Sequence, residues 1–525
     1  MKSFLPLFSG LVFGVLSGYD RLVFRGHLRS LMPTGRMALY CHTNGVLLKD
    51  FKQHAQSATD RLLAASEAVA RATGRPVEYL PSPKTRKEDY ARRIAERDGI
   101  RDGLISVLKC VEPCWSFTLR GNRQTKKLEF RSEPRQCLHV YHYYQHPVFG
   151  FLYARLQTWF PFTIQVGING RAWLARQMDA AGLAYRRHDN CFTWLQDVER
   201  AQALMAEQSR RNWPQALDGV RRLVHPSHPD VLGKWQSDYY WSLKQSEWAT
   251  DVMFRDPAEL QRVYGDWLRY AIRAYRSPDV LRFLGQKLPA HGEVHGKFVG
   301  EVLSDLGRRL DGLRIKHRVG ENSIKMYDKA GQVLRVETTI NDPSAFKVYR
   351  AKEGEPDGAK QWRPLRSGVA DVHRRSEVSQ AANQRYLEGL AAVVHTEPLQ
   401  ALTEGLGERV REPGAKGRRL RGLNLLGAAD GALLAAIGRP EHVVNGFRNR
   451  DVSEALYGEP SRDATERRRR SARVTRLLRL LRGHRLIRKV AKAHRYQVTE
   501  TGRAVVTAVL AARNVSTEKL VSLAA

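Results

Sequence analysis

A run of arginines that also has helical periodicity constrains this chain more than any other feature of its sequence. Residues 467–495 include 13 Lys or Arg and no Asp or Glu. One apolar face runs through this segment with the helical spacing i, i+3, i+4, i+7, and its members are Val474, Leu477, Leu478 and Leu481. The arginines therefore cover one side of a helix that packs by its other side, which excludes a disordered basic tail.

The side of this helix that faces away from the apolar residues carries the first candidate binding residues. At about 100° per residue, that side holds Arg468, Arg469, Arg476 and Arg479, with Thr475 at its edge. Clustered like charge is unfavourable unless a polyanion compensates it, and the phosphates of nucleic acids do so. We therefore predict that these residues contact nucleic acid. The alternative, a solvated basic face on a protein-binding unit, stays open.

The segments around the basic helix predict a defined order of elements. Periodicity predicts helices over 429–437 and 451–456 before it, strands over 486–490 and 495–499 after it, and a closing helix over 501–512. This order, with the sequence of residues 496–503, resembles MarR-like winged helices. The resemblance covers residues 421–525, about a fifth of the chain. It implies a duplex-DNA-binding domain whose wing carries Lys492, His494 and Arg495.

The charge balance extends the expected nucleic-acid contact beyond this unit. The formal net charge of the 525-residue chain is +33. Residues 411–525 hold 25 Lys or Arg and 10 Asp or Glu, a charge of +15, so residues 1–410 retain +18. We therefore expect the body to contact single-stranded DNA or RNA as well. A membrane partner would need an exposed basic amphipathic helix or a long apolar span, and the sequence has neither.

Cysteine usage and the N-terminal segment bear on the compartment. Five cysteines in 525 residues favour a reducing environment, and we expect a cytoplasmic protein. Residues 4–16 are apolar like the core of a signal peptide, but Pro6, Gly10 and Gly14 interrupt them. We interpret this segment as a buried first strand.

The pattern of predicted elements indicates an α+β fold, a helix-flanked and mostly antiparallel sheet with the C-terminal winged helix-turn-helix domain. Closely spaced strands require antiparallel pairing, because parallel crossovers need a dozen or more residues. The predicted domains are an α+β domain over 1–200, a helical aromatic-rich segment over 201–290, a hairpin with helices over 291–410, a linker over 411–420 and the winged helix over 421–525.

A predicted hairpin in the third segment carries the residues that suggest chemistry. Its predicted strands are 323–328 and 333–340. The segments 324–329 and 334–340 read Tyr-Asp-Lys and then Leu-Arg-x-Glu, which resembles a paired-strand motif of rolling-circle replication initiators. Those proteins nick one DNA strand with a tyrosine and a divalent cation. The resemblance implies catalytic roles for Tyr327, Lys329 and Arg335, and metal ligation by Asp328 and Glu337.

Two observations count against a simple transfer of that motif. Strand alternation places Asp328 on the face opposite to Tyr327 and Lys329, so the set does not share one pocket unless the ribbon bends. The His-apolar-His metal motif of such initiators is also missing, since His139 and His142 are separated by one residue too many. A solvated or ion-paired hairpin therefore stays open as the structural alternative.

A second carboxylate pair offers further metal ligands. Glu247 and Asp251 are four residues apart, which on a helix places both on one face, able to share a cation. Pairing with a nearby Arg or Lys is the alternative. The cofactor predicted for either carboxylate set is Mg²⁺ or Mn²⁺.

These observations predict a DNA-binding protein of a mobile element or plasmid, with a body that nicks strands in the manner of a replication initiator or transposase. The alternatives are a non-enzymatic MarR-like transcription regulator and a structural RNA-binding protein. Homo-oligomer formation, the target sequence and the identity of the nucleophile stay open. About 400 residues beyond the winged helix argue against a bare regulator.

Overall fold

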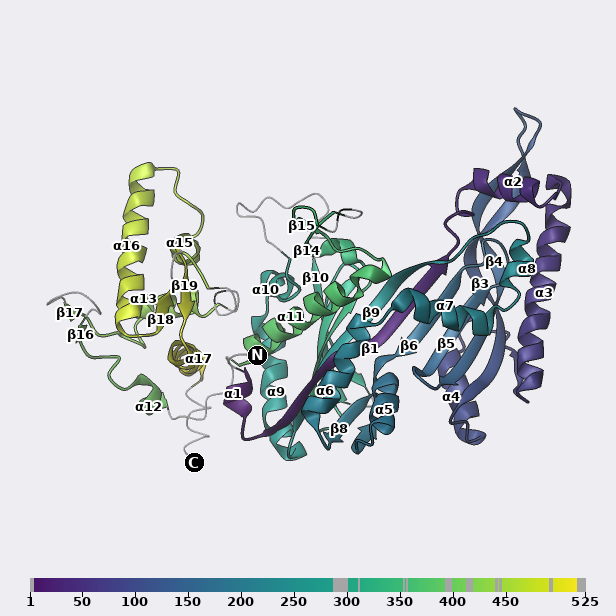
Figure 1. Cartoon of the computed structure of the whole chain (residues 1–525). Helices are drawn as coiled ribbons and strands as arrows, with labels where there is room; N and C mark the ends of the chain where they lie inside the picture. Colours follow the sequence, from purple (N-terminus) through teal and green to yellow (C-terminus); the bar gives the residue numbers. More distant parts are fainter. Residues whose placement is uncertain are drawn as a thin grey trace.

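The structure is a computed structural model, and it describes residues 4–286, 301–309, 312–352, 355, 357–391, 399–411, 419–439, 442, 446–490 and 494–516. Its largest feature is a mixed α/β body built on one long, mostly antiparallel sheet (Figure 1). The predicted helix-flanked antiparallel architecture is confirmed at this level.

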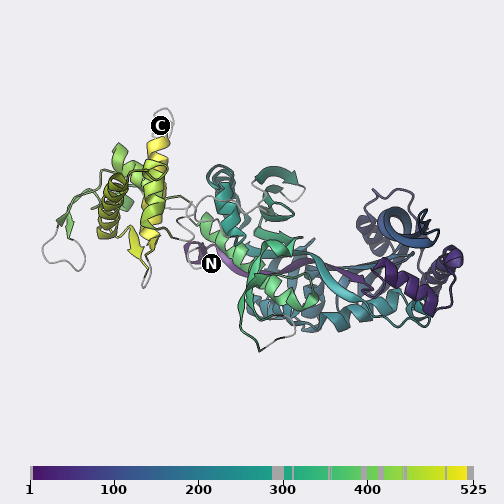
Figure 2. The ribbon, with the colours of Figure 1, turned by 90° about the horizontal axis from the view of Figure 1, so that it is seen from above.

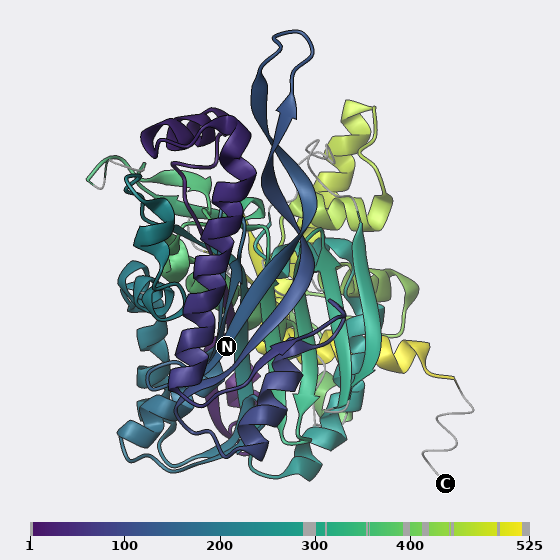
Figure 3. The ribbon, with the colours of Figure 1, turned by 90° about the vertical axis from the view of Figure 1, so that its right-hand side faces the viewer.

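The large sheet contains eleven strands among the described residues, in the order β10-β11-β12-β13-β9-β1-β6-β5-β4-β3-β2. Only the β2–β3 pair is parallel. Along the chain the strands are β1 (Val12–His27), β2 (Val77–Tyr79), β3 (Gly103–Gly121), β4 (Leu128–His146), β5 (Gly150–Gln157), β6 (Ile164–Asn169), β9 (Tyr240–Phe254), β10 (Val302–Arg309), β11 (Gly312–Val319), β12 (Asn322–Lys329) and β13 (Val333–Ile340). The distal part of the β3–β4 hairpin projects beyond its surroundings (Figure 3).

Helices lie along both faces of the sheet (Figure 2). In the body they are α1 (Phe4–Phe8), α2 (Thr34–Thr43), α3 (Phe51–Ala72), α4 (Lys87–Arg97), α5 (Gly170–Ala180), α6 (Val198–Ala206), α7 (Trp213–Val224), α8 (His228–Leu232), α9 (Pro257–Ala274), α10 (Ser277–Phe283) and α11 (Val372–Leu390). Two short ribbons complete it: β7 (Tyr185–His188) with β8 (Cys191–Leu195), and β14 (Lys347–Arg350) with β15 (Gln361–Pro364).

Helix α11 covers one face of the sheet where β9 and β13 pair. The buried amide of Asn383 donates to the carbonyls of Trp248 and Val336 and to the hydroxyl of Thr250. On the opposite face, Arg171 at the start of α5 reaches Asp251 of β9. Different helices therefore bury the two faces of these central strands. Both faces contain buried polar groups that bond to side chains of those helices.

The expected first strand begins later than the sequence suggested. Residues 4–8 form helix α1, and β1 starts only at Val12. The rings of Phe4 and Phe8 pack on Trp267 of α9, with centroids 5.6 and 5.2 Å apart. The apolar residues are buried as predicted, but by helix-to-helix packing rather than by strand pairing.

The prediction of a helical segment over 201–290 was wrong in its centre. Residues Tyr240–Phe254 form strand β9, which pairs with β1 on one side and β13 on the other. Aromatic and β-branched residues such as Trp241, Trp248 and Val252 favour strands. Residues 248–254 are buried on both faces, so this half of β9 lacks the apolar–polar alternation that its first residues show.

The C-terminal unit has a hydrophobic core of its own, formed only by residues from Leu402 onward. Its elements are α12 (Leu399–Thr403), β16 (Val410–Arg411), β17 (Arg419–Leu420), α13 (Ala428–Ile437), α15 (Asn449–Tyr457), α16 (Ala464–Gly483), β18 (Ile487–Lys489), β19 (Tyr496–Val498) and α17 (Glu500–Asn514). The predicted order of helices and strands is present here. Most of the predicted linker, 412–418, lies outside the described residues.

No helix among the described residues combines the length and the apolar character needed to cross a membrane.

Candidate metal centre

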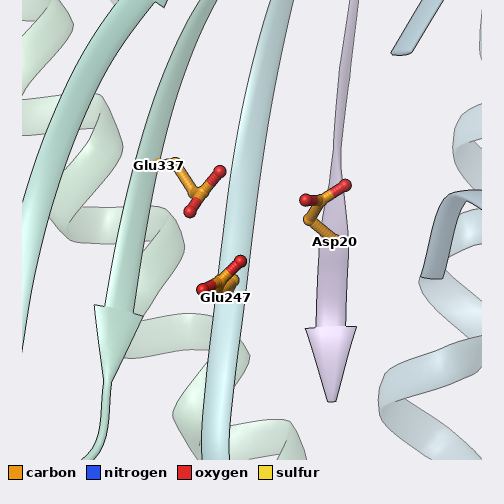
Figure 4. A group of neighbouring side chains, drawn as sticks. All are labelled: Asp20, Glu247 and Glu337. Carbon is orange, nitrogen blue, oxygen red and sulfur yellow. The ribbon is translucent and has the colours of Figure 1, made fainter. Parts of the chain in front are cut away.

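Three carboxylates from three neighbouring strands converge on one face of the sheet (Figure 4). They belong to Asp20 of β1, Glu247 of β9 and Glu337 of β13, and one oxygen of each lies within 4.8 Å of the others. Asp20 and Glu337 are buried, while Glu247 is half-buried. Carboxylate oxygens at this separation suit a hard divalent cation such as Mg²⁺ or Mn²⁺.

The register of the sheet explains why these residues meet. On β13, Arg335 pairs with Asp251 and Glu337 pairs with Ala249, so all four side chains share one face with Glu247. Ala249 is small and leaves the space between Glu247 and Glu337 open to the longer side chains. The two carboxylates are thus diagonal neighbours across the β9–β13 pair.

Asp20 joins them through a β-bulge in β1. Tyr19 pairs with Trp248 and Arg21 pairs with Glu247, so Asp20 is the extra residue between two consecutive partners on β9. Bulges are common beside functional sites, where they redirect a side chain. Gly170 at the start of α5 fits against this bulge, because a Cβ at its position would lie 1.8 Å from the carbonyl oxygen of Tyr19.

Buried cations surround the carboxylates. The guanidinium of Arg335 donates to both carboxylate oxygens of Asp251 at 2.5 and 2.8 Å and lies 3.3 Å from Asp20. Arg171 reaches Asp251 at 2.9 Å and Asp20 at 3.8 Å. Lys325 donates to Glu337 at 2.5 Å. Two arginines therefore hold Asp251 at short distances, whereas Asp20, Glu247 and Glu337 have fewer or more distant cationic partners.

The charges of the cluster do not balance when every group is ionised. Four carboxylates (Asp20, Glu247, Asp251 and Glu337) face three cations (Arg171, Lys325 and Arg335), when Arg21 and Lys329 are counted with the acids beside them, Glu88 and Asp189. Burial and the nearby charge of Glu337 raise the pKa of Glu247 to about 7. Burial also raises the pKa of Asp20, against the opposing effect of Arg335.

Glu337 behaves differently, because its cations prevail. Burial alone would raise its pKa, but Lys325 and Arg335 outweigh that effect and hold the pKa at about 2. The carboxylate of Glu247 has no hydrogen bond or ion pair among the described residues. Oδ1 of Asp20 likewise lacks a hydrogen-bond partner there, although Arg335 lies beside it. These two groups have capacity left for a ligand.

A cavity of about 300 Å³ opens onto Asp20 and Glu247. The side chains of Phe151 and Tyr153 form part of its wall, and its rim includes Arg21, Arg86 and Arg92. Glu88 and Asp89 also line it, and they pair with these arginines at 2.9 to 3.4 Å. Asp20 and Glu247 therefore line a polar cavity whose other charged residues are these arginines with Glu88, Asp89 and Asp189, while Glu337 is buried behind them.

Of the residues that the sequence predicted for chemistry, most lie on this face. The hydroxyl of Tyr327 donates to Glu337 at 2.6 Å, and Arg335 is fully buried beside Asp251. Lys329 is buried, with its ammonium 5.8 Å from the Tyr327 ring and 3.7 Å from Asp189.

Asp328 does not join them. Its carboxylate lies on the other face of the sheet and accepts from Gln261 of α9, because successive strand residues point to opposite faces. The expectation that Glu247 and Asp251 share a helical face also fails, since both lie on strand β9; residues four apart still share a face in a strand. His139 and His142 lie on β4, which β1, β6 and β5 separate from β9.

Three residues of the cluster, Asp20, Arg171 and Lys325, were not predicted from the sequence. Lys325 lies two residues before Tyr327 on the same strand face, so strand alternation was an available signal. Asp20 is the one acid in the mainly apolar strand β1, and a buried acid there needs partners. Its bulge, however, depends on pairing with a strand more than 200 residues away.

The predicted nucleic-acid-binding residues of the C-terminal unit are mostly exposed. Arg468, Arg469, Thr475 and Arg476 of α16 are exposed, and Arg479 is half-buried. Arg469 pairs with Glu466 at 2.7 Å, while Val474, Leu478 and Leu481 are buried in the core as expected. At the hairpin, His494 is exposed and Arg495 half-buried, and Lys492 lies outside the described residues.

Comparison of the chain with models of protein families, with curated proteins and with solved structures finds no significant match.

Proposed function

We propose that this protein cleaves a nucleic-acid strand with a divalent cation held by Asp20, Glu247 and Glu337. The observation that carries the proposal is the convergence of these carboxylates, two of which, Asp20 and Glu247, line a polar cavity that also contains arginines. Phosphodiester cleavage requires a cation that stabilises the developing charge, a nucleophile, and groups that position the phosphates. The cluster contains side chains of each kind.

The charge of the cluster supports a cation. With Glu247 ionised, negative charge accumulates beside Glu337 and Asp20, and this charge adds to burial, which is the largest cause of the raised pKa of Glu247. A divalent cation would offset that negative charge and release the proton, since metal ligands bind in their deprotonated form. Glu337 still has ligand capacity, because each carboxylate oxygen has a second lone pair besides the one used by Lys325 or Tyr327.

Tyr327 is the nucleophile that we propose. Its hydroxyl is 2.6 Å from Glu337, and burial together with that carboxylate raises its pKa well above the ordinary value. The free hydroxyl is therefore protonated at neutral pH and needs a nearby cation to become reactive. Attack by Tyr327 on phosphorus would leave the protein joined to one DNA end and release the other as a free hydroxyl.

The C-terminal unit supplies the second half of the proposal. We assign it as a winged-helix DNA-binding domain in which α16 meets duplex phosphates. Support comes from the exposed arginines of α16, the order of the surrounding elements and the formal charge of the chain. Strand nicking beside a bound duplex fits a plasmid or mobile element.

The test is a cleavage assay on labelled single-stranded and hairpin DNA with Mg²⁺ or Mn²⁺, resolved on denaturing gels. Wild type should give a metal-dependent cut and a protein–DNA adduct, and Glu337→Gln should give neither. Tyr327→Phe should lose the adduct. The matched control is Asp328→Asn, next to Tyr327 on the opposite face of the sheet, which should retain both products. Cleavage that persists in Glu337→Gln, or in chelator, would contradict the assignment.

A further inference from the structure

The β14–β15 ribbon presents two large aromatic rings to solvent. Tyr349 and Trp362 are directly paired across the two strands, with their ring centroids 5.8 Å apart. Their exposed fractions are 59% and 63%, among the highest of any large hydrophobic residue described. Because both rings are exposed, neither provides the stabilisation that burial of an aromatic side chain normally gives.

Strand alternation keeps these rings outside while the ribbon itself is anchored. Val348 and Arg350, on the inner face, are buried, and Phe346 and Leu365 at the ribbon's base belong to the core of the body. The buried carboxylate of Asp371 then ties the ribbon down. It accepts from Arg366 of the same segment at 3.1 Å and lies 4.0 Å from Arg350. The aromatic pair therefore sits on a fixed support.

The surface beside the rings is basic. Lys347 is exposed and lies on the outer face next to Tyr349, opposite Pro364. Lys360, two residues before Trp362, is also exposed. The acids among the described residues of this segment are Glu355, which pairs with Lys352 at 2.9 Å, and Asp357. Two exposed aromatic rings, whose planes are tilted by 56°, each offer a face on which a base can stack, and the flanking cations are complementary to the adjoining phosphates.

We propose that Tyr349 and Trp362 form a stacking platform for single-stranded nucleic acid. Bases lie on the two rings, and Lys347 and Lys360 neutralise the adjoining phosphates. The formal charge of +33 favours a polyanion over a protein partner for this exposed apolar pair. This proposal does not rest on strand cleavage, since stacking needs neither the cation nor the carboxylates of the metal centre.

The experiment measures binding of a fluorescent oligothymidylate of about 20 nucleotides to the full chain by anisotropy, in EDTA so that cleavage does not occur. The double variant Tyr349→Ala/Trp362→Ala should bind at least about tenfold more weakly. Tyr349→Phe/Trp362→Phe should bind nearly as wild type does, because stacking is kept. Trp115→Ala is the matched control, since Trp115 has the same exposed fraction of 63% on β3.

A blunt-ended duplex of equal length separates stacking from general attraction. The double alanine variant should bind that duplex within about twofold of wild type, because paired bases do not reach the rings. Failure of wild type to bind the oligothymidylate at about 0.1 M salt would overturn the proposal, as would equal losses for the single strand and the duplex. Equal binding of the oligothymidylate by wild type and the double alanine variant would also overturn the proposal, and it would favour a protein as the partner of the two rings. Each result is independent of whether Glu337→Gln abolishes cleavage.

Discussion

At the scale of single residues, Glu247 is the group whose state depends most on its surroundings. Its pKa in the folded protein, about 7, exceeds the ordinary value of 4.5. The folded chain therefore retains a proton that the unfolded chain has released. The resulting stabilisation is fully present below about pH 4.5 and is lost as the pH rises through 7.

Replacing Glu247 with glutamine should remove that pH dependence. At pH 8, Glu247→Gln should increase the free energy of unfolding by up to about 3 kcal/mol, with a much smaller change at pH 5. Urea denaturation in EDTA at both pH values measures this difference. An equal effect at the two pH values would show that Glu247 is not the titrating group.

Replacing Arg335 should lower the free energy of unfolding, in contrast to replacing Glu247. Its guanidinium is fully buried and holds Asp251 by two hydrogen bonds. Arg335→Met should lower the free energy of unfolding by about 3–5 kcal/mol, because Asp251 and Asp20 would keep buried charge without this partner. Arg318→Met, at an exposed position on β11, is the control and should change stability little. Similar denaturation midpoints for the two variants would rule out the buried network as a stabilising unit.

At the scale of elements, the bulge of β1 and the start of α5 form one unit. Gly170 is needed where α5 meets the carbonyl of Tyr19, since an added Cβ would overlap it. Gly170→Ala should displace Asp20 and weaken Mn²⁺ binding at least about tenfold, as the loss of a ligand does. Gly219→Ala in α7, where a Cβ meets no atom within 4 Å, should leave Mn²⁺ binding unchanged. Unaltered affinity in Gly170→Ala would mean that Asp20 is not a ligand.

Helix α16 is the element that should govern duplex binding. Arg476→Glu with Arg479→Glu reverses two charges on its outer side while leaving the buried Val474 and Leu478 in place. Duplex affinity of the full chain should fall at least about tenfold, and its dependence on salt should become shallower. Arg222→Glu with Arg269→Glu, two exposed helical arginines of the body, is the control. An equal loss in both double variants would indicate non-specific attraction.

Elements with a local signal were the ones that the sequence could predict. The β12–β13 hairpin and the apolar face of α16 follow from spacing within fewer than 20 residues, and both are present. The alternation of β12 also separated Asp328 from Tyr327 correctly. Strand β9 escaped prediction because both faces of its second half, residues 248–254, are buried, and that pattern resembles a buried helix.

At the scale of the whole molecule, the three carboxylates of the candidate metal centre meet because the sheet brings distant strands together. Asp20, Glu247 and Glu337 belong to β1, β9 and β13, which are neighbours in space in the order β13-β9-β1 but not in sequence. No local pattern links an acid in the first strand with a hairpin more than 300 residues later. The sequence therefore predicted two of the three carboxylates as metal ligands, and only the fold adds the third.

The most direct test of this account is a titration of the full chain with Mn²⁺, followed by electron paramagnetic resonance of the free ion. We predict one site per chain that Mg²⁺ displaces and whose affinity falls as the pH drops below about 7, where Glu247 becomes protonated. Glu337→Gln should lose the site and Asp328→Asn should keep it. A chain that binds no Mn²⁺, or a Glu337→Gln variant that binds it as tightly as wild type, would contradict the assignment of these carboxylates as a metal centre.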